Sequence, residues 1–259
     1  MKKILAFLVA AFAALAAASA QEIYESKTFV SSDGHSLNYR ELTPLKTEAK
    51  KKYPLVIFLH GAGERGDDNE KQLVHGSQMF LNPYNRETYP AYVLFPQCPE
   101  SSFWAFPDIP KYAGRGTTGQ MAPAFKAVKE MIDEYIAMPT VDPSRVYILG
   151  LSMGGMGTFD MVSRFPEIFA AAIPICGAAS PGKIKAAKNV KFRIYHGDAD
   201  PTVPVECSRA AYRELKEAGA DVEYFEFAGC GHASWNPAFN QPDFMEWIFA
   251  QKKSRRARK

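Results

Sequence analysis

Short apolar runs alternate with amphipathic stretches along most of the chain. Residues 55–59 read LVIFL without a polar side chain, as expected for a strand that is buried on both faces. Before them, residues 23–30 and 36–42 are predicted to form two strands joined by the turn Ser32-Asp33-Gly34. The other apolar runs that predict strands are 92–95, 146–149, 170–175, 192–195 and 222–227.

Helical patterns fall between these runs. Residues 121–137 carry apolar side chains close to a period of 3.6 residues, and the other candidate helices are 153–164, 204–218 and 242–249. The alternation predicts an α/β fold with a doubly wound, mostly parallel sheet and helices on both of its faces. Residues 176–191, between two predicted strands, are too few for a helical lid, so no large cap is expected. Ligands of such sheets bind beyond the carboxyl ends of the strands.

The first twenty residues have the features of an export signal. Lys2 and Lys3 precede an apolar run at 4–17, and Ala18-Ser19-Ala20 fits a small-residue cleavage site. The alternative is an N-terminal membrane anchor, but the run is short and rich in alanine. We therefore expect residues 1–20 to be removed, and the protein to be exported to the periplasm or secreted without stable membrane insertion.

Charge is unevenly distributed between the body of the chain and its last eight residues. The formal net charge is +3, but residues 252–259 (KKSRRARK) contain six basic residues and no acid. The predicted domain at 21–251 is left with 23 basic and 28 acidic residues, which argues against nucleic acid as a partner. Residues 252–259 are expected to be a solvated, disordered tail, with docking to an anionic surface as the alternative.

A nucleophile motif follows the apolar run at 146–149. Residues 150–154 read G-L-S-M-G and match G-x-S-x-G, in which a serine stands on a sharp turn between a strand and a helix. Ser152 is therefore the predicted nucleophile, and the positive end of the following helix points toward charge that forms near it. The alternative is a glycine-rich helix start without a catalytic role.

Two backbone amides are candidates for an oxyanion hole, the pair of donors that stabilises a developing alkoxide. One belongs to Met153, directly after the nucleophile, and the other to Ala62, with Gly63 as a neighbouring alternative, in the loop after residues 55–59. His60 begins the same loop and is expected to orient its neighbours rather than act as a base.

The acid and base are sought after the next two strands. Residues 196–204 read HGDADPTVP, and Asp200 is favoured over Asp198 because it lies deeper in the turn. His232 lies on a glycine-flanked loop after residues 222–227, where it is the predicted general base. The chain order Ser152, Asp200, His232 is that of one of the known serine-hydrolase arrangements.

These segments together resemble secreted bacterial esterases of the α/β-hydrolase superfamily. The motifs that carry the resemblance are FLHGAGERG, FPQCPESSFW, GLSMGG, PICGAA, HGDADPTVP and GHASW. The chain is similar to the feruloyl and acetylxylan esterases of carbohydrate esterase family 1 and to related predicted peptidases or phospholipases. The resemblance implies the triad Ser152, Asp200 and His232, acyl transfer through an acyl-enzyme, and no need for a metal or organic cofactor.

The substrate is less defined than the reaction. Phe103, Trp104 and Trp235 are the candidate substrate-binding residues, because aromatic faces near the site can stack on a sugar or a phenolic ring; the alternative is that they pack loops onto the body. The expected substrate is a feruloyl or acetyl ester, in a polysaccharide or a small molecule. The chain leaves the choice between monomer and dimer open.

Export would permit disulfides between the four cysteines. Cys207–Cys230 is the expected bridge, because the acid and base loops must meet, and Cys98–Cys176 is a weaker candidate. The alternative is four free thiols that pack as small apolar side chains.

Two other functions compete with the esterase. A serine peptidase would use the same triad, but such enzymes commonly add a gating domain or a large cap. A non-catalytic carbohydrate-binding protein would have no use for Ser152, Asp200 and His232 together.

Overall fold

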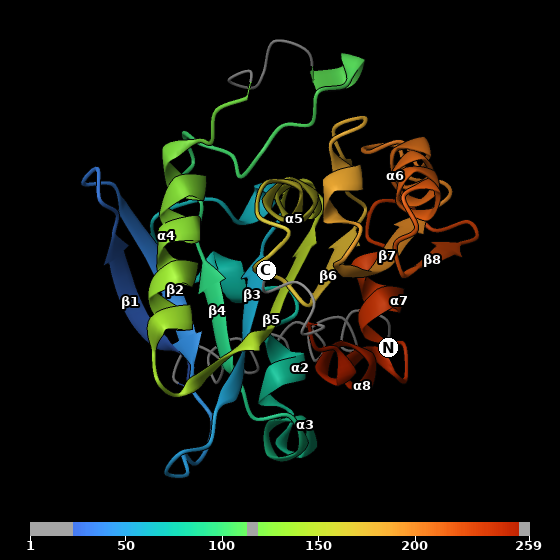
Figure 1. Ribbon diagram of the computed structural model, residues 1–259. Coiled ribbons are helices and arrows are strands. Elements are labelled where there is room, and N and C mark those ends of the chain that lie inside the picture. Colours follow the sequence, from blue (N-terminus) through green and yellow to red (C-terminus); the bar gives the residue numbers. More distant parts are fainter. Residues whose placement is uncertain (1–22, 113–118, 254–259) are drawn as a thin grey trace, which may run out of the picture.

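One eight-stranded sheet organises the protein (Figure 1). The computed structural model describes residues 23–112 and 119–253. The strand order is β1-β2-β4-β3-β5-β6-β7-β8, with β1 and β2 antiparallel to their neighbours and the other pairs parallel. The strands are β1 (Glu25–Val30), β2 (Ser36–Leu42), β3 (Tyr53–Leu59), β4 (Tyr92–Pro96), β5 (Val141–Leu151), β6 (Ala171–Ile175), β7 (Lys191–Gly197) and β8 (Val222–Phe227). The doubly wound, mostly parallel architecture predicted from the sequence is confirmed.

Helices cover both faces of this sheet. The longer helices are α4 (Pro123–Ala137), α5 (Met153–Arg164) and α6 (Glu206–Glu217), and the shorter ones are α2 (Ser77–Leu81), α3 (Pro83–Thr88), α7 (Trp235–Phe239) and α8 (Phe244–Ala250). The short 3-10 helices are η1 (Ala62–Glu64), η2 (Lys71–Leu73), η3 (Pro110–Tyr112) and η4 (Ile184–Ala187). The long helices begin up to two residues after the predicted positions, and α4 begins with a proline, which suits the first turn because it has no amide hydrogen to leave unpaired.

Strand β3 separates two hydrophobic cores. All seven of its residues are buried, and their side chains alternate between the faces, as the pleat of a strand requires. Leu55 and Ile57 pack with Val128 of α4 on one face, whereas Val56 and Phe58 belong to the core on the other face. The second core also contains the buried apolar side chains of α2, α7 and α8. Burial on both faces explains why this strand reads as an unbroken apolar run.

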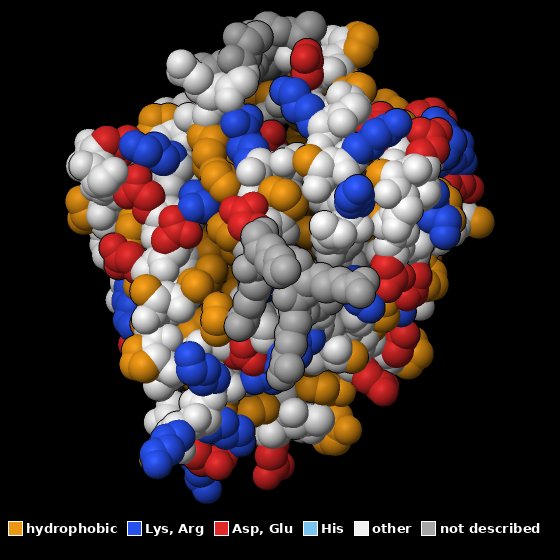
Figure 2. All heavy atoms as spheres, in the orientation of Figure 1, with side chains coloured by type: hydrophobic (Ala, Val, Ile, Leu, Met, Phe, Trp, Pro, Cys, Tyr) orange, Lys and Arg blue, Asp and Glu red, His pale blue; other side chains and the backbone are white. Residues whose placement is uncertain are grey.

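The link between β6 and β7 contains one 3-10 helix, η4. It has no helical lid, in agreement with the expectation from its length. Within the described part of the chain, no helix combines the length and the apolar character needed to span a membrane. Over the face drawn in Figure 2, acidic and basic side chains are intermingled rather than gathered into one basic patch.

The two ends of the chain were predicted to lie outside the domain. The expected signal at residues 1–20 lies outside the described residues, as does most of the expected tail, 254–259. Lys253, however, is anchored to the body: its amide donates to Ser144 O at 2.9 Å, and its ammonium donates to Glu167 O and Ile168 O at 2.8 Å. The prediction that a free tail begins at Lys252 was therefore wrong, and the anchored body reaches Lys253.

Candidate active site

Ser152 occupies the turn between β5 and α5. Its backbone has φ 54° and ψ −116°, a conformation that residues with a side chain rarely adopt. The Ser152 amide donates to Ile175 O at 2.9 Å, which ties the turn to the end of β6. The turn places the serine at the carboxyl edge of the sheet, where the sequence predicted the nucleophile.

Close backbone packing explains the glycines of this motif. A Cβ on Gly154 would lie 1.9 Å from Leu59 O, and one on Gly150 would lie 2.3 Å from Gly154 O. A Cβ on Gly155 would lie 2.6 Å from Ile175 O. All three distances are below any van der Waals contact, so the turn can be this sharp only without those side chains.

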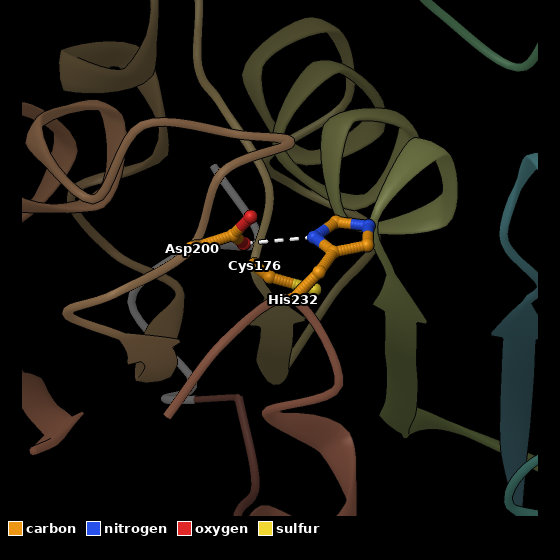
Figure 3. Close-up of side chains that lie close together, drawn as sticks. All are labelled: Cys176, Asp200 and His232. Atoms are coloured by element: carbon orange, nitrogen blue, oxygen red, sulfur yellow. Dashed lines mark hydrogen bonds and ion pairs between the residues drawn. The ribbon is translucent and has the colours of Figure 1, made fainter. Parts of the chain in front are cut away.

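Ser152, His232 and Asp200 form a continuous hydrogen-bonded chain. His232 Nε2 lies 2.8 Å from Ser152 Oγ. His232 Nδ1 lies 2.7 Å from Asp200 Oδ2, and this pair is joined by the dashed line in Figure 3. Since the carboxylate can only accept, Nδ1 carries the ring proton and Nε2 accepts from the serine hydroxyl. The side chain of His232 is 22% exposed and that of Asp200 is fully buried, so the site opens to solvent at the histidine.

The buried Asp200 carboxylate is stabilised as an anion. Its Oδ1 accepts hydrogen bonds from the amides of Thr202 at 2.7 Å and Val203 at 3.0 Å. Burial raises the pKa of Asp200, but the hydrogen bonds from His232 and from these two amides outweigh it and hold the pKa below its usual range.

The structure also distinguishes Asp200 from Asp198, the two aspartates that the sequence offered as the acid. Asp200 faces His232, whereas Asp198 is exposed and its Oδ1 accepts from the Gly229 amide at 2.6 Å. Asp198 thus fastens the loop of the acid to the loop of the base.

A second histidine, His196, touches the acid, and its role was not predicted from the sequence. His196 Nε2 lies 3.0 Å from Val203 O and 3.2 Å from Asp200 Oδ2, and its Nδ1 lies 2.7 Å from Ser208 Oγ. The ring is fully buried, and this burial lowers the pKa of His196. It therefore stands as a neutral donor behind Asp200. The only signal was its position four residues before the acid, at the end of a strand.

His60 orients the neighbouring loop, as expected. It is buried, and burial lowers its pKa to about 4. Its Nδ1 donates to Gly61 O at 2.6 Å, and its Nε2 accepts from the Cys98 amide at 2.9 Å. A neutral imidazole with both nitrogens engaged has no free lone pair for general base catalysis.

The two expected oxyanion donors belong to segments that adjoin Ser152. Met153 is the first residue of α5, so its amide has no acceptor within the helix. Ala62 begins the short helix η1 directly after Gly61, and a Cβ on Gly61 would lie 3.7 Å from Ser152 Cβ. The loop that carries Ala62 therefore runs against the nucleophile.

Comparison with known protein families places the chain in one of them. Residues 41–241 match the model of a family described as Phospholipase/Carboxylesterase. The chain belongs to this family. It is a carboxylesterase of the α/β-hydrolase type.

Relatives of this carboxylesterase include plant and fungal proteins. A probable carboxylesterase SOBER1-like of Arabidopsis thaliana is 30% identical over 70% of this chain and 73% of that protein. Feruloyl esterase B of Neurospora crassa is 28% identical over 68% of this chain and 69% of that protein. Among solved structures, a thermostable esterase superposes with a TM-score of 0.83 at 35% identity, covering 90% of this chain and 64% of that chain.

Trp104 is not available to a substrate, so the prediction that it binds one was wrong. Trp104 is 1% exposed, and its Nε1 donates to His60 O at 3.1 Å. It fills the space left by Gly157 on α5, where a Cβ would lie 2.8 Å from Trp104 Cβ. Trp104 supports the loop that begins at His60 and cannot stack on a sugar.

Phe103 lies nearer the surface but away from the triad. Its ring centroid is 4.3 Å from that of Phe106 and 4.3 Å from the guanidinium carbon of Arg65. It borders a cavity of about 510 Å³, and none of the three triad residues is among the described residues that line this cavity. Among the described residues, the ring contacts of Phe103 are therefore with Phe106 and Arg65 rather than with the candidate triad.

Trp235 does lie beside the base, together with two residues that were not predicted from the sequence. Its ring centroid is 5.5 Å from that of His232 and 5.1 Å from that of His75. His75 Nε2 in turn lies 3.8 Å from Glu64 Oε1. His75 has no motif around it, and Glu64 lies in the FLHGAGERG segment without a role that the motif assigns; only the fold brings the two residues to Trp235.

All four cysteines of this carboxylesterase are free, so neither expected disulfide is present. Cys98 follows β4 and Cys176 follows β6, and two strands separate them in the sheet, too far for a disulfide. Cys207 packs beside Met156 and Val203, whereas Cys230 Sγ faces Gly231 O at 3.6 Å. The acid and base loops are joined by the Asp198–Gly229 hydrogen bond instead.

Proposed function

We propose that this carboxylesterase is an exported serine esterase that hydrolyses feruloyl or acetyl esters of plant cell-wall polysaccharides. The observation that carries the proposal is the hydrogen-bonded chain from Ser152 through His232 to the buried Asp200. A hydroxyl that donates to a histidine, itself oriented by a carboxylate, is the arrangement that activates serine for acyl transfer.

The reaction follows from the positions of these groups. Ser152 Oγ attacks the ester carbonyl while His232 Nε2 accepts its proton, and the amides of Met153 and Ala62 stabilise the oxyanion. His232 then protonates the leaving alcohol, and an acyl-enzyme forms. Water, activated by the same histidine, attacks the acyl-enzyme and releases the acid. Asp200 stabilises the imidazolium in both steps.

The residues around His232 favour an ester substrate whose alcohol portion has an extended polar surface. The leaving alcohol must lie within reach of Nε2, so Trp235, which packs against the His232 ring, borders the alcohol side of the site. His75 and Glu64 extend this border with polar atoms. An aromatic face with adjacent hydrogen-bonding groups suits a sugar, and the link from β6 to β7 leaves room for a polymer.

The experiment that tests the proposed function compares five substrates with one enzyme preparation. They are methyl ferulate, an aryl acetate, feruloylated xylan, acetylated xylan and an aryl amide. We expect turnover of the esters, release of acid from at least one polysaccharide ester, and a much lower rate on the amide. Turnover of the small esters without release from feruloylated or acetylated xylan would reject the substrate class, and a faster amide reaction would favour a peptidase.

Replacing Trp235 with alanine tests whether this residue binds the alcohol portion of the substrate. For a feruloylated sugar ester we expect kcat/KM to fall about tenfold relative to methyl ferulate, because loss of one stacking surface costs about 1.4 kcal/mol. The ratio of the two substrates is the readout, since any effect of Trp235 on His232 itself changes both rates. Phe103→Ala is the control and should leave the ratio unchanged. An equal loss on both esters would show that Trp235 supports only the base.

A further inference from the structure

One thiol lies directly beside the acid and base of the candidate triad. Cys176 follows β6, is fully buried, and has the uncommon backbone φ of 40°. One ligand atom each from Cys176, Asp200 and His232 lies within 4.8 Å of the others. Figure 3 draws the three side chains converging from separate loops. The acyl-transfer steps above make no use of this thiol.

We propose that Cys176, Asp200 and His232 form an inhibitory binding site for a soft divalent cation, represented by Zn²⁺. Sulfur, imidazole nitrogen and carboxylate oxygen are the three ligand types that Zn²⁺ takes in proteins. Bond lengths of about 2.0–2.3 Å require ligand atoms roughly 3.3–3.8 Å apart, so side-chain shifts of about 1 Å would close the site. Water can fill the fourth position of the tetrahedron.

The charges in this buried place would balance. A thiolate and a carboxylate together match the charge of a divalent cation, so no net charge would be buried with it. Burial raises the pKa of the Cys176 thiol to about 12, so the thiol is protonated until a cation displaces its proton to solvent. Of the three ligand side chains, that of His232 is the one that is partly exposed to solvent, at 22%.

A cation bound here would stop the reaction by changing the histidine tautomer. Nδ1, the nitrogen that faces Asp200, now carries the ring proton. When Nδ1 binds the cation, the neutral ring holds its one proton on Nε2, the nitrogen that faces Ser152. His232 then has no lone pair to accept the serine proton, and Asp200 no longer orients the ring.

The effect on activity rests on the proposed function, whereas binding of the cation does not. Two measurements therefore separate them. In the first, Zn²⁺ is titrated into the full chain during hydrolysis of an aryl acetate, and a chelator is then added. In the second, Co²⁺ is added in place of Zn²⁺ to the wild type and to Ser152→Ala, and the thiolate-to-cobalt charge-transfer absorption is recorded.

The expected result is reversible inhibition of the wild type that depends on Cys176. Loss of an outer-shell partner already weakens metal sites by about 10–100-fold, so Cys176→Ala should raise the half-inhibiting Zn²⁺ concentration by about tenfold or more. Each variant is compared with its own rate without metal. Cys207→Ala is the matched control, because it removes another free thiol and should leave the inhibition unchanged.

The cobalt band should appear in the wild type and in Ser152→Ala, and be absent in Cys176→Ala. If the alanine variant does not fold, Cys176→Ser provides the same comparison. A cobalt band without loss of activity would reject the inhibitory role and leave the binding site. Equal inhibition of the wild type and Cys176→Ala, or no thiolate band in the wild type, would overturn the proposal.

Discussion

Ser152→Ala is expected to lower kcat for every ester substrate by about 10⁴-fold or more. The variant has no hydroxyl to attack the carbonyl, so no acyl-enzyme can form. Removing one oxygen from a side chain at the solvent edge leaves the packing of the turn intact, and the melting temperature should therefore stay close to that of the wild type. Steady-state hydrolysis of an aryl acetate, with thermal unfolding measured beside it, checks both parts.

The same variant distinguishes catalysis from binding. Substrate should still bind to Ser152→Ala, because the oxyanion amides and Trp235 are unchanged. A mechanism-based fluorophosphonate should label the wild type and not the variant. Retention of wild-type activity would show that another residue is the nucleophile and would refute the mechanism.

Asp200→Asn should give the second-largest loss, with kcat lower by about 10³–10⁴-fold. An asparagine amide facing Nδ1 donates a hydrogen bond, which stabilises the tautomer with the proton on Nε2. That tautomer cannot accept the proton of Ser152, and no carboxylate remains to stabilise the imidazolium. The measurement is kcat for methyl ferulate or an aryl acetate at neutral pH.

Asp198→Asn is the matched control for this replacement. Asp198 accepts a hydrogen bond from the Gly229 amide, and an asparagine carbonyl oxygen can accept the same bond. The control variant should therefore keep kcat within a few-fold of the wild type. If Asp198→Asn were as slow as Asp200→Asn, the loss would reflect disturbance of the joined loops rather than the role of Asp200.

The sheet could be predicted from sequence because its central strands are buried on both faces. Such strands need apolar residues at every position, and that requirement leaves a run such as 55–59 that is easy to recognise. The helix α2 has only five residues, too few to show a helical period. The start of α3 did carry a local signal, since Asn82 caps it and Pro83 follows.

The candidate triad could be proposed because each residue follows a strand and the strands end at one edge. Trp104 and Phe103 could not be told apart from substrate-binding aromatics, since sequence does not report which face of a ring is covered. His196, His75 and Glu64 were missed for a related reason. Their neighbours are distant in the chain or separated by a turn, and no spacing rule links them to Asp200 or Trp235.

The close backbone packing at the nucleophile turn has a consequence for motion. Gly154 touches Leu59 O and Gly155 touches Ile175 O, so three parallel strands and α5 are in direct contact around Ser152. Amide hydrogens buried in such a contact exchange with solvent only when the whole domain opens. The loop that carries His232 is packed as closely against the loop of the acid, because a Cβ on Gly197 would lie 2.2 Å from Cys230 O. Both partners of the hydrogen bond between Ser152 and His232 thus stand on close-packed backbone, and we expect neither segment to leave the site without a wider opening of the domain.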